Sequence, residues 1–357
     1  MCTVRQRVPE TIRPAELSFF SLADRLARIS AQGDPLERLD GVIGWAMFRP
    51  VLDRALPAAQ AKGPGGRPAY DRLLLCKILV LQRLYQLSDE AVQFQILDRL
   101  SFQRFLGLSL ADRVPDQNTI REFREALQQA GAFQSLFDVF REHLAARGLL
   151  PKEGVIVDAS FVEVPRQRNT REENAALKEG QTPEDWSAKK RAHKDVDARW
   201  TKKNAQTFYG YKDHIKVNLR TKLIESAVVT TASVHDSQAI DALVQKGDMV
   251  VFGDSAYSGQ PVEEQMEAKG VDTVIVRKGV RGRELNETEK AENREISGTR
   301  ARVEHAFAVM SGQAGRIFLR YIGQARNQAA VQLMNLCHNL RRYETIVRLK
   351  LHPLTPV

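Results

Sequence analysis

The sequence predicts an α/β protein in which an all-helical region precedes a mixed β-sheet. Two observations lead to this fold class. Apolar residues recur at helical spacing through residues 15–150, whereas short, β-branched apolar runs bounded by turn residues follow from Pro151 onward. The element order after Pro151 reads β-β-β-α-β-α-β-α-α, which is typical of a mixed sheet with helices on both faces.

The first 150 residues divide into helices at recognisable boundaries. Residues 15–56 carry short helical patterns, and residues 62–69 are rich in glycine and proline, which predicts a linker. The apolar stripe of residues 71–87 predicts a longer helix. Ser88 stands at the N-cap of the next helix, and Asp116 stands before a third. Gly131 ends that third helix, and Gly148 ends a fourth.

Four arginines on these helices leave two interpretations open. They fit either a helix-turn-helix-like DNA reader or a plain helical bundle with arginines on its wet face. Periodicity alone favours the bundle. The arginines are Arg99, Arg104, Arg121 and Arg124.

Four apolar runs predict the strands of the second part. They cover residues 154–164, a probable antiparallel hairpin over 209–233, residues 249–257 and residues 272–279. The polar stretch between the first two strands has too little apolar content to pack alone. From about Glu287 the pattern predicts two long helices, interrupted near Gly312–Gly323.

Length and composition exclude several classes of protein. A chain of 357 residues has room for roughly two domains. No apolar run approaches the ~18 residues that a membrane span requires, and the N-terminus lacks the apolar core of a signal peptide. The three cysteines, Cys2, Cys76 and Cys337, match no zinc spacing and are interpreted as free thiols. We therefore expect a soluble cytoplasmic protein.

The positive charge is concentrated in one segment. The net charge is +9, and residues 161–222 carry 15 basic and 9 acidic groups, which places +6 of the excess there. Such concentration indicates a polyanionic partner. A solvated basic loop is the alternative.

Two acids lie on buried strands. Asp158 follows Val155-Ile156-Val157, and Asp254 follows Val250-Val251-Phe252-Gly253. A carboxylate on an apolar strand is costly unless a partner compensates its charge, and strand ends are where ligands bind in open α/β sheets. Each acid could instead cap the turn that follows its strand. Together, next to a basic segment, the two acids favour a site for a divalent metal.

A third carboxylate would complete such a site. Glu304, in the helix GTRARVEHAF, is the best candidate, with an i,i+4 ion pair to Arg300 as the alternative role. Other chemistries find less support, because the sequence has no HExxH, no GxSxG and no phosphate-binding glycine loop. His235 and His305 lie near these acids in sequence and are better interpreted as ordinary polar contacts than as metal ligands.

These residues resemble bacterial insertion-sequence transposases of the DDE class, specifically the IS-five family. VDASFVEVPRQRN resembles the first catalytic block of that family, HDS with FGDSAY the second, and RARVEHAF the third. The helical segment KGPGGRPAYDRLLLCKILVLQRLYQL and the segment RWTKKNAQTFYGYKDHIKVN are also similar. The blocks occur in the right order over nearly the whole chain.

The resemblance implies an RNase H-like catalytic core over residues 151–346, after a DNA-binding or oligomerisation region over 1–150 and before a tail over 347–357. It implies Asp158, Asp254 and Glu304 as catalytic metal ligands, with Mg²⁺ as cofactor and Mn²⁺ as a substitute. It also implies binding of terminal inverted repeats and target DNA, metal-dependent end cleavage and strand transfer, a homo-oligomeric complex, and a location at the bacterial nucleoid.

The same resemblance suggests how DNA is held, and where the chain departs from the family. We expect the basic insertion 165–205 to lie near DNA. Candidate DNA-binding residues are Arg166, Arg168, Lys189, Lys190, Arg191, Lys202, Lys203 and Arg300. Trp186 and Trp200 either stack on a base or pack internally.

The chain departs from the family signature at one position. The signature expects Lys or Arg seven residues after the glutamate, where this chain has Ser311. Arg316 or Lys278 would have to replace that contact.

Two alternatives to a transposase remain open at this point. One is an RNase H-like nuclease that cuts DNA without joining it, against which the long helical region argues. The other is a non-catalytic DNA-binding protein derived from a transposase. Retention of all three acids argues against the second, because carboxylates weaken binding to phosphates.

Overall fold

The computed structural model describes most of the chain. The described residues are 21–57, 68–203, 205–279, 283–312 and 315–353. Most of the predicted linker 62–69 therefore lies outside them, as does Cys2.

The first part of the described chain is helical, as predicted. Its helices are α1 (Ser21–Ala31), α2 (Pro35–Val42), α3 (Arg49–Ala55), α4 (Arg72–Leu84), α5 (Asp89–Asp98), α6 (Leu100–Leu106), α7 (Gln117–Gln129) and α8 (Ala132–Ala146), with a 3₁₀ turn η1 (Trp45–Phe48). Two predicted caps are confirmed. The Ser88 hydroxyl accepts a hydrogen bond from the Ala91 N–H at 3.1 Å, and the Asp116 carboxylate accepts one from the Thr119 N–H at 2.8 Å.

Seven strands form one mixed sheet. They are β1 (Val155–Glu163), β2 (Arg199–Lys203), β3 (Gln206–Asn218), β4 (Ile224–Thr231), β5 (Val250–Gly253), β6 (Asp272–Ile275) and β7 (Ile317–Phe318). The central strand β1 pairs antiparallel with β3 and parallel with β5, which in turn pairs parallel with β6. Strand β4 lies on the other edge of β3, and β2 pairs with the first residues of β3.

The second part also contains helices. They are α9 (Arg171–Lys178), α10 (Ala188–Ala192), α11 (Ile240–Leu243), α12 (Gln260–Lys269), α13 (Glu287–Ser311) and α14 (Gln324–Leu349), with 3₁₀ turns η2 (Asp236–Ala239) and η3 (Ser255–Tyr257). Helix α14 continues past residue 346, where the sequence placed the start of the tail. The sequence did not predict β2, β7, α9 or α10. None of the helices in the described ranges combines the length and the apolarity needed to cross a membrane.

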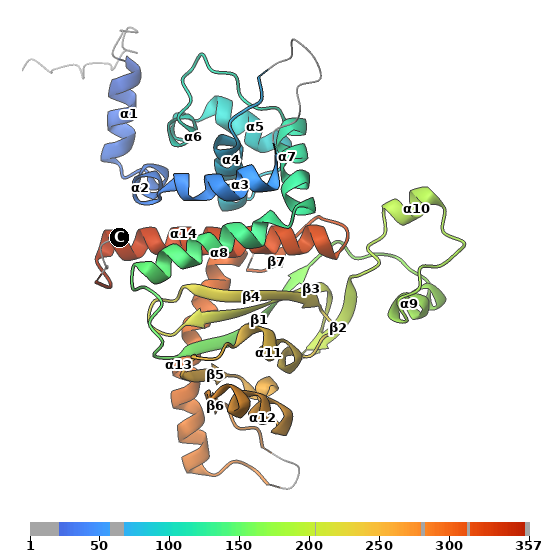
Figure 1. Ribbon diagram of the computed structural model, residues 1–357. Helices are drawn as coiled ribbons and strands as arrows, with labels where there is room; N and C mark the ends of the chain where they lie inside the picture. Colours follow the sequence, from blue (N-terminus) through green and yellow to red (C-terminus); the bar gives the residue numbers. More distant parts are fainter. Residues whose placement is uncertain (1–20, 58–67, 204, 280–282, 313–314, 354–357) are drawn as a thin grey trace, which may run out of the picture.

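Helices cover both faces of the sheet, as the element order predicts. Side chains alternate along β1, so that Ile156 joins the core that includes residues of α13 and α14, whereas Val155 and Val157 join a smaller core with α11 and α12. Figure 1 shows α8 and α14 lying between the sheet and the other N-terminal helices. It also shows α9 and α10 on an arm that projects away from the sheet.

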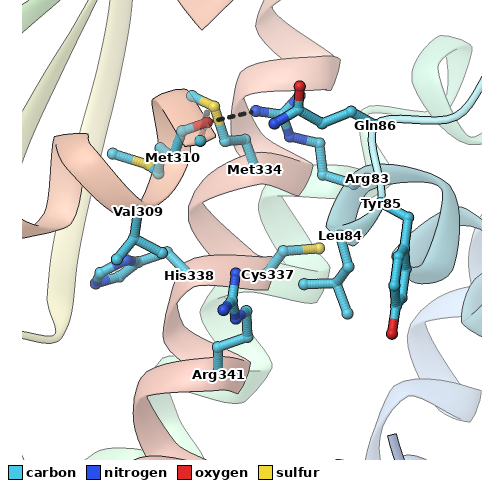
Figure 2. A pocket seen from close by; sticks show the side chains of 11 residues that line it. Arg83, Leu84, Tyr85, Gln86, Val309, Met310, Met334, Cys337, His338 and Arg341 are labelled. Atoms are coloured by element: carbon cyan, nitrogen blue, oxygen red, sulfur yellow. Dashed lines mark hydrogen bonds between the residues drawn. The ribbon is translucent and has the colours of Figure 1, made fainter. Parts of the chain in front are cut away.

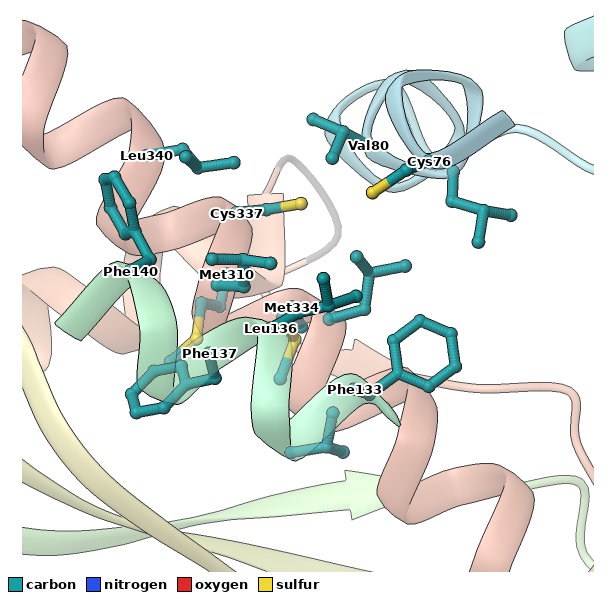
Figure 3. Packing of buried hydrophobic residues seen from close by; sticks show 14 of the residues in the cluster. Cys76, Val80, Phe133, Leu136, Phe137, Phe140, Met310, Met334, Cys337 and Leu340 are labelled. Atoms are coloured by element: carbon teal, nitrogen blue, oxygen red, sulfur yellow. The ribbon is translucent and has the colours of Figure 1, made fainter. Parts of the chain in front are cut away.

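A single hydrophobic core joins the helical region to one face of the sheet. Figure 3 shows Cys76 and Val80 of α4 close to Cys337 of α14, with Phe137 of α8 and Met310 of α13 in the same cluster. Both cysteines are free thiols, and burial raises the pKa of each to about 12. They are therefore inert packing residues.

Gly210 is the residue of β3 where pairing with β2 ends and pairing with β1 begins. Gly210 pairs with Glu163 of β1 and also with Arg199 of β2. Its φ is +143°, and a Cβ atom there would lie 2.3 Å from the Val162 carbonyl oxygen. Only glycine fits this position without moving the backbone. The β2–β3 hairpin therefore continues past the end of β1, starting from a backbone position that requires glycine.

Candidate active site

The two strand acids lie on neighbouring parallel strands. Val155 pairs with Val251 and Ile156 with Phe252, so two residues further along each chain the register places Asp158 next to Asp254. Because side chains alternate along a strand, both acids share the face of Ile156, which α13 covers. The structure thus brings together two of the three predicted metal ligands.

On the edge of β1 that pairs with β5 and β7, none of the described strands pairs with Asp158. Strand β3 pairs with the whole of one edge of β1, so β5 and β7 must share the other edge. Strand β5 pairs at residues 155 and 156, and β7 at residues 162 and 163. Asp158 lies in the interval between these two short partners.

Each acid also makes a local hydrogen bond. Asp254 caps η3 by accepting the Ala256 N–H at 2.9 Å, and Asp158 accepts the Ala159 N–H at 2.8 Å. The capping role that the sequence left open is therefore real for Asp254. One carboxylate oxygen of each acid is used in this way, which fixes the orientation of the side chain.

The charge of Asp158 is poorly solvated. Burial raises its pKa to about 6, and the negative charge of Asp254 adds to the effect, while Arg300, the Ala159 N–H and Lys203 oppose it. Arg300 of α13 donates to Asp158 Oδ2 at 3.2 Å, and both side chains are largely buried. A carboxylate in this position gains from any added positive charge.

Glu304 lies apart from the two aspartates. Val303, Ala306 and Met310 form the buried stripe of α13, whereas Glu304 is exposed, one turn beyond Arg300. Arg300 pairs with Asp158, so the alternative i,i+4 ion pair with Glu304 is not formed and Arg300 joins two distant elements instead. In the ranges that the structure describes, no three acidic, histidine or cysteine side chains are grouped to hold a metal. A role for Glu304 as third ligand stays a prediction.

The donor set nevertheless suits a hard divalent cation. Mg²⁺ prefers carboxylate oxygens and often uses only one or two of them from the protein. Asp158 supplies these oxygens from within β1, and Asp254 from the residue that follows β5. The neighbouring Arg300 shows that the site already stabilises a positive charge against Asp158.

Tyr257 is a site residue that the sequence did not single out. Its side chain is 1% exposed, and its hydroxyl has no hydrogen-bond partner among the described residues. Burial raises its pKa well above the ordinary value, and the charges of Asp158, Asp236 and Asp254 raise it further. The only sequence signal was its place three residues after Asp254, at the end of an apolar strand.

A buried ion pair holds the HDS segment, residues 235–237, against strand β3. Lys212 of β3 donates to Asp236 at 2.8 Å and to the Val234 carbonyl at 2.7 Å.

The two histidines lie in different surroundings. His235 forms a hydrogen bond with the Ser237 hydroxyl. Burial lowers the pKa of His305, and the nearby positive charges of Lys222 and Arg342 lower it further. His235 therefore makes a local polar contact within its own turn.

The basic insertion contains a small folded unit. Trp186 is 3% exposed and donates to Glu173 at 2.8 Å, and Lys190 binds the same carboxylate at 2.5 Å. Hydrogen bonds from Lys190, the Thr170 N–H and Trp186 lower the pKa of Glu173 to about 2. Trp186 therefore packs internally, and Lys190 is already paired.

The other six candidate DNA-binding cations of the insertion and of the adjoining hairpin are exposed. They are Arg166, Arg168, Lys189, Arg191, Lys202 and Lys203. Trp200 is 40% exposed, with the Arg166 guanidinium 5.7 Å from its ring centre. Lys203 is close enough to lower the pKa of Asp158, so the hairpin links this basic surface to the aspartates.

The N-terminal arginines do not share one wet face. Arg104 binds Asp34 at 2.5 Å and Arg124 binds Asp89 at 2.5 Å, both within the helical region. Arg99 lies 5.2 Å from the Phe102 ring centre, and Arg121 is exposed. Two of the four arginines therefore hold helices together.

Two cavities lie away from the aspartates, where the helical region meets α13 and α14. The smaller has a volume of about 500 Å³, and Figure 2 shows Arg83 of α4 donating across it to the Met310 carbonyl of α13 at 3.2 Å. His338 and Arg341 of α14 complete its wall in the same view. The larger, of about 790 Å³, shares Arg83 and Gln86 with it.

Comparison with known proteins supports a transposase. Residues 150–340 match the family model described as a transposase DDE domain, and residues 23–126 match one described as a transposase domain (DUF772). Among solved structures, the cryo-EM structure of a piggyBac transposase synaptic complex with hairpin DNA is similar over 90% of this chain and 77% of that chain, with 12% identity and a TM-score of 0.45. Because the DDE model matches more than half of the chain, this protein belongs to the transposase DDE domain family.

Proposed function

We propose that the chain is a DNA transposase of an IS-five insertion sequence, which binds the terminal inverted repeats and catalyses metal-dependent end cleavage and strand transfer. The family match supports the general activity. The observation that carries the chemistry is the position of Asp158 next to Asp254 on parallel strands. Paired carboxylates beside a basic surface suit phosphodiester chemistry.

Asp158 and Asp254 would hold Mg²⁺, or Mn²⁺ in its place, with Glu304 as third ligand. When bound, the metal supplies the positive charge that activates a water and stabilises the leaving oxygen. Glu304 is assigned because it follows Arg300 by one turn on the helix that contacts Asp158. The hydrogen bonds from Ala159 and Ala256 keep the two aspartates in place for this role.

The cations of the chain would position the DNA. Arg300 neutralises Asp158 here and would turn to a phosphate when Asp158 has another cationic partner. Lys203 lies near Asp158, and the exposed arginines and lysines of the insertion 165–205 extend the same surface. Such contacts fix the register of DNA without reading its sequence.

We further propose how the chain is divided and where it acts. The sheet has three antiparallel strands, β4, β3 and β1, followed by the parallel strands β5 and β6, and we interpret it as an RNase H-like core over 151–346. The region 1–150 would bind DNA or a second copy, with 347–357 as a tail. We expect a homo-oligomer that holds both ends, at the bacterial nucleoid.

A non-catalytic DNA-binding protein is the second candidate. The exposure of Glu304, away from the two aspartates, favours it. Ser311, at the position where the family signature expects Lys or Arg, points the same way; its hydroxyl donates to the Ala308 carbonyl at 3.2 Å. Arg316 and Lys278 are both exposed and could replace that cation.

End-labelled DNA separates the two candidates. We would incubate the full chain with a duplex that carries the ends of its own element, in Mg²⁺, in Mn²⁺ and in EDTA. The transposase is expected to cut the 3′ end and join it to target DNA in either metal, and to do neither in EDTA. Binding without cleavage in both metals would establish the non-catalytic protein, and cleavage without joining would indicate a nuclease.

A further inference from the structure

The larger cavity is a groove with an excess of positive charge. It has a volume of about 790 Å³ and lies between the helices α4, α5, α7 and α8 and the segment that joins α13 to α14. Five arginines and two acids line it. One acid, Asp89, is neutralised by Arg124, whose two terminal nitrogens bind its oxygens at 2.5 and 2.8 Å.

One wall of the groove is an extended segment with alternating side chains. Ile317 and Leu319 are buried, at 2% and 6% exposure, whereas Arg316, Phe318 and Arg320 are exposed. These three exposed residues line the groove, together with Leu319. Alternate residues of an extended chain point to the same side. The segment therefore presents an Arg-Phe-Arg row to the groove.

The aromatic member of this row is open to a ligand. Phe318 is 39% exposed, although most phenylalanines of the described chain are buried. The Arg316 guanidinium lies 5.4 Å from its ring centre. Across the same groove, the Arg124 guanidinium lies 5.6 Å from the ring centre of Tyr321. Paired arginines and aromatic rings in a positively charged groove are the surface that unpaired nucleic acid prefers.

The row is joined to the strand that carries Asp158. Strand β7 pairs with β1 at Val162 and Glu163, four residues after Asp158. At about 3.3 Å per residue, that is about 13 Å along the strand.

We propose that this groove binds an unpaired DNA strand, with Arg316 and Arg320 on phosphates and Phe318 stacked on a base. The proposal rests on the proposed function, because a cut or opened DNA end supplies the unpaired strand. Stacking requires a free base face, and paired bases inside a duplex have none. The groove should therefore favour single-stranded over duplex DNA.

The test measures binding of labelled oligonucleotides to the full chain in EDTA, by fluorescence anisotropy. The probes are a single strand of mixed sequence and the blunt duplex of the element's end. Phe318→Ala should weaken single-strand binding by about 5- to 150-fold, the loss of one base stack, and leave duplex binding unchanged. Phe318→Tyr should restore it. Arg316→Ala with Arg320→Ala should lower the salt slope of single-strand binding by about 1.4.

Phe94→Ala is the matched control, because Phe94 is 62% exposed and does not line the groove. It should bind both probes as the unaltered chain does. Single-strand binding that is unchanged in Phe318→Ala, or an equal loss of affinity for both probes, would overturn the proposal that the groove binds unpaired DNA. If the chain also cuts its ends in Mg²⁺, that result leaves the transposase standing. A Phe318-dependent preference for single strands without any cleavage would support the groove and reject the transposase.

Discussion

Arg300 on α13 donates to Asp158 on β1 over 3.2 Å, although 142 residues separate the two in the sequence. The contact ties the long helix to the strand that carries the first acid. It also places a cation where burial makes the carboxylate charge costly. The charge of Asp158 is thus partly compensated by the protein itself.

Loss of Arg300 should destabilise the fold through Asp158. In Arg300→Ala, the largely buried carboxylate loses its partner, and we expect the free energy of unfolding at pH 7.5 to fall by about 1–3 kcal/mol. Asp158→Asn in the same chain should recover much of that loss, because no charge is left unpaired. Urea denaturation in EDTA of the two single variants and the double variant measures this coupling. Additive effects would show that the ion pair does not stabilise the protein.

Asp213 should give the protein a measurable loss of stability between about pH 4 and pH 7. It is fully buried, and burial raises its pKa to about 7, against a hydrogen bond from Asn335 and the nearby charge of Arg83. The folded state therefore keeps a proton that the unfolded state releases near pH 4. The stabilising contribution of Asp213 is therefore fully present below about pH 4. It falls by about 1.4 kcal/mol per pH unit as pH rises from about 4 to about 7.

Asp213→Asn should remove this slope, as measured by urea denaturation at pH 5.0, 6.0 and 7.5. The exposed Asp185→Asn serves as control and should keep the pH profile of the unaltered chain. The slope is the informative quantity, since the new amide also changes the overall stability. A slope that persists in Asp213→Asn would assign it to another group.

The projecting arm should depend on Glu173. Glu173→Ala removes the acceptor shared by Trp186 and Lys190, so we expect faster proteolysis between residues 178 and 198 and a red shift of Trp186 emission. The global unfolding transition should move little, since the arm lies outside the main core. The neighbouring Glu172→Ala is the matched control, because its side chain is exposed. Equal protease sensitivity of both variants would mean that Glu173 does not hold the arm.

The exposed cations of the arm should act through phosphates. If Lys189 and Arg191 each contact one phosphate of duplex DNA, the combined alanine variant should lower the slope of log K against log salt by about 1.8. The affinity should fall equally for specific and unrelated duplexes. Lys246→Ala, an exposed cation between α11 and β5, should change neither quantity. An unchanged slope in the arm variant would place the arm away from DNA.

The sequence predicted the parts of the fold that follow from local patterns. The strands that carry Asp158 and Asp254 are continuous apolar runs, and Ser88 and Asp116 cap helices as expected. Strand β7 has only two residues, so no periodicity could reveal it. The arm was missed because its packing depends on Trp186 and one ion pair within a polar stretch.

The site was predicted only in part for a similar reason. The apolar runs before Asp158 and Asp254 signalled that both acids were costly and therefore paired. The partner of Arg300 could not be predicted, because Asp158 lies 142 residues away and helical spacing indicates only the neighbour Glu304. Tyr257 gave no signal, since an aromatic residue after a buried strand is usually plain packing. Its closeness to three aspartates depends on the turn η3 and the HDS segment.

Asp254→Asn tests most directly whether Asp158 and Asp254 form the catalytic metal site. Cleavage of the labelled element end in Mg²⁺ should fall below detection, while binding of the same duplex in EDTA is retained or tightened as a negative charge is lost. Asp272→Asn, an exposed acid at the start of the neighbouring strand β6, should cut as the unaltered chain does. Cleavage that survives in Asp254→Asn would contradict the assignment.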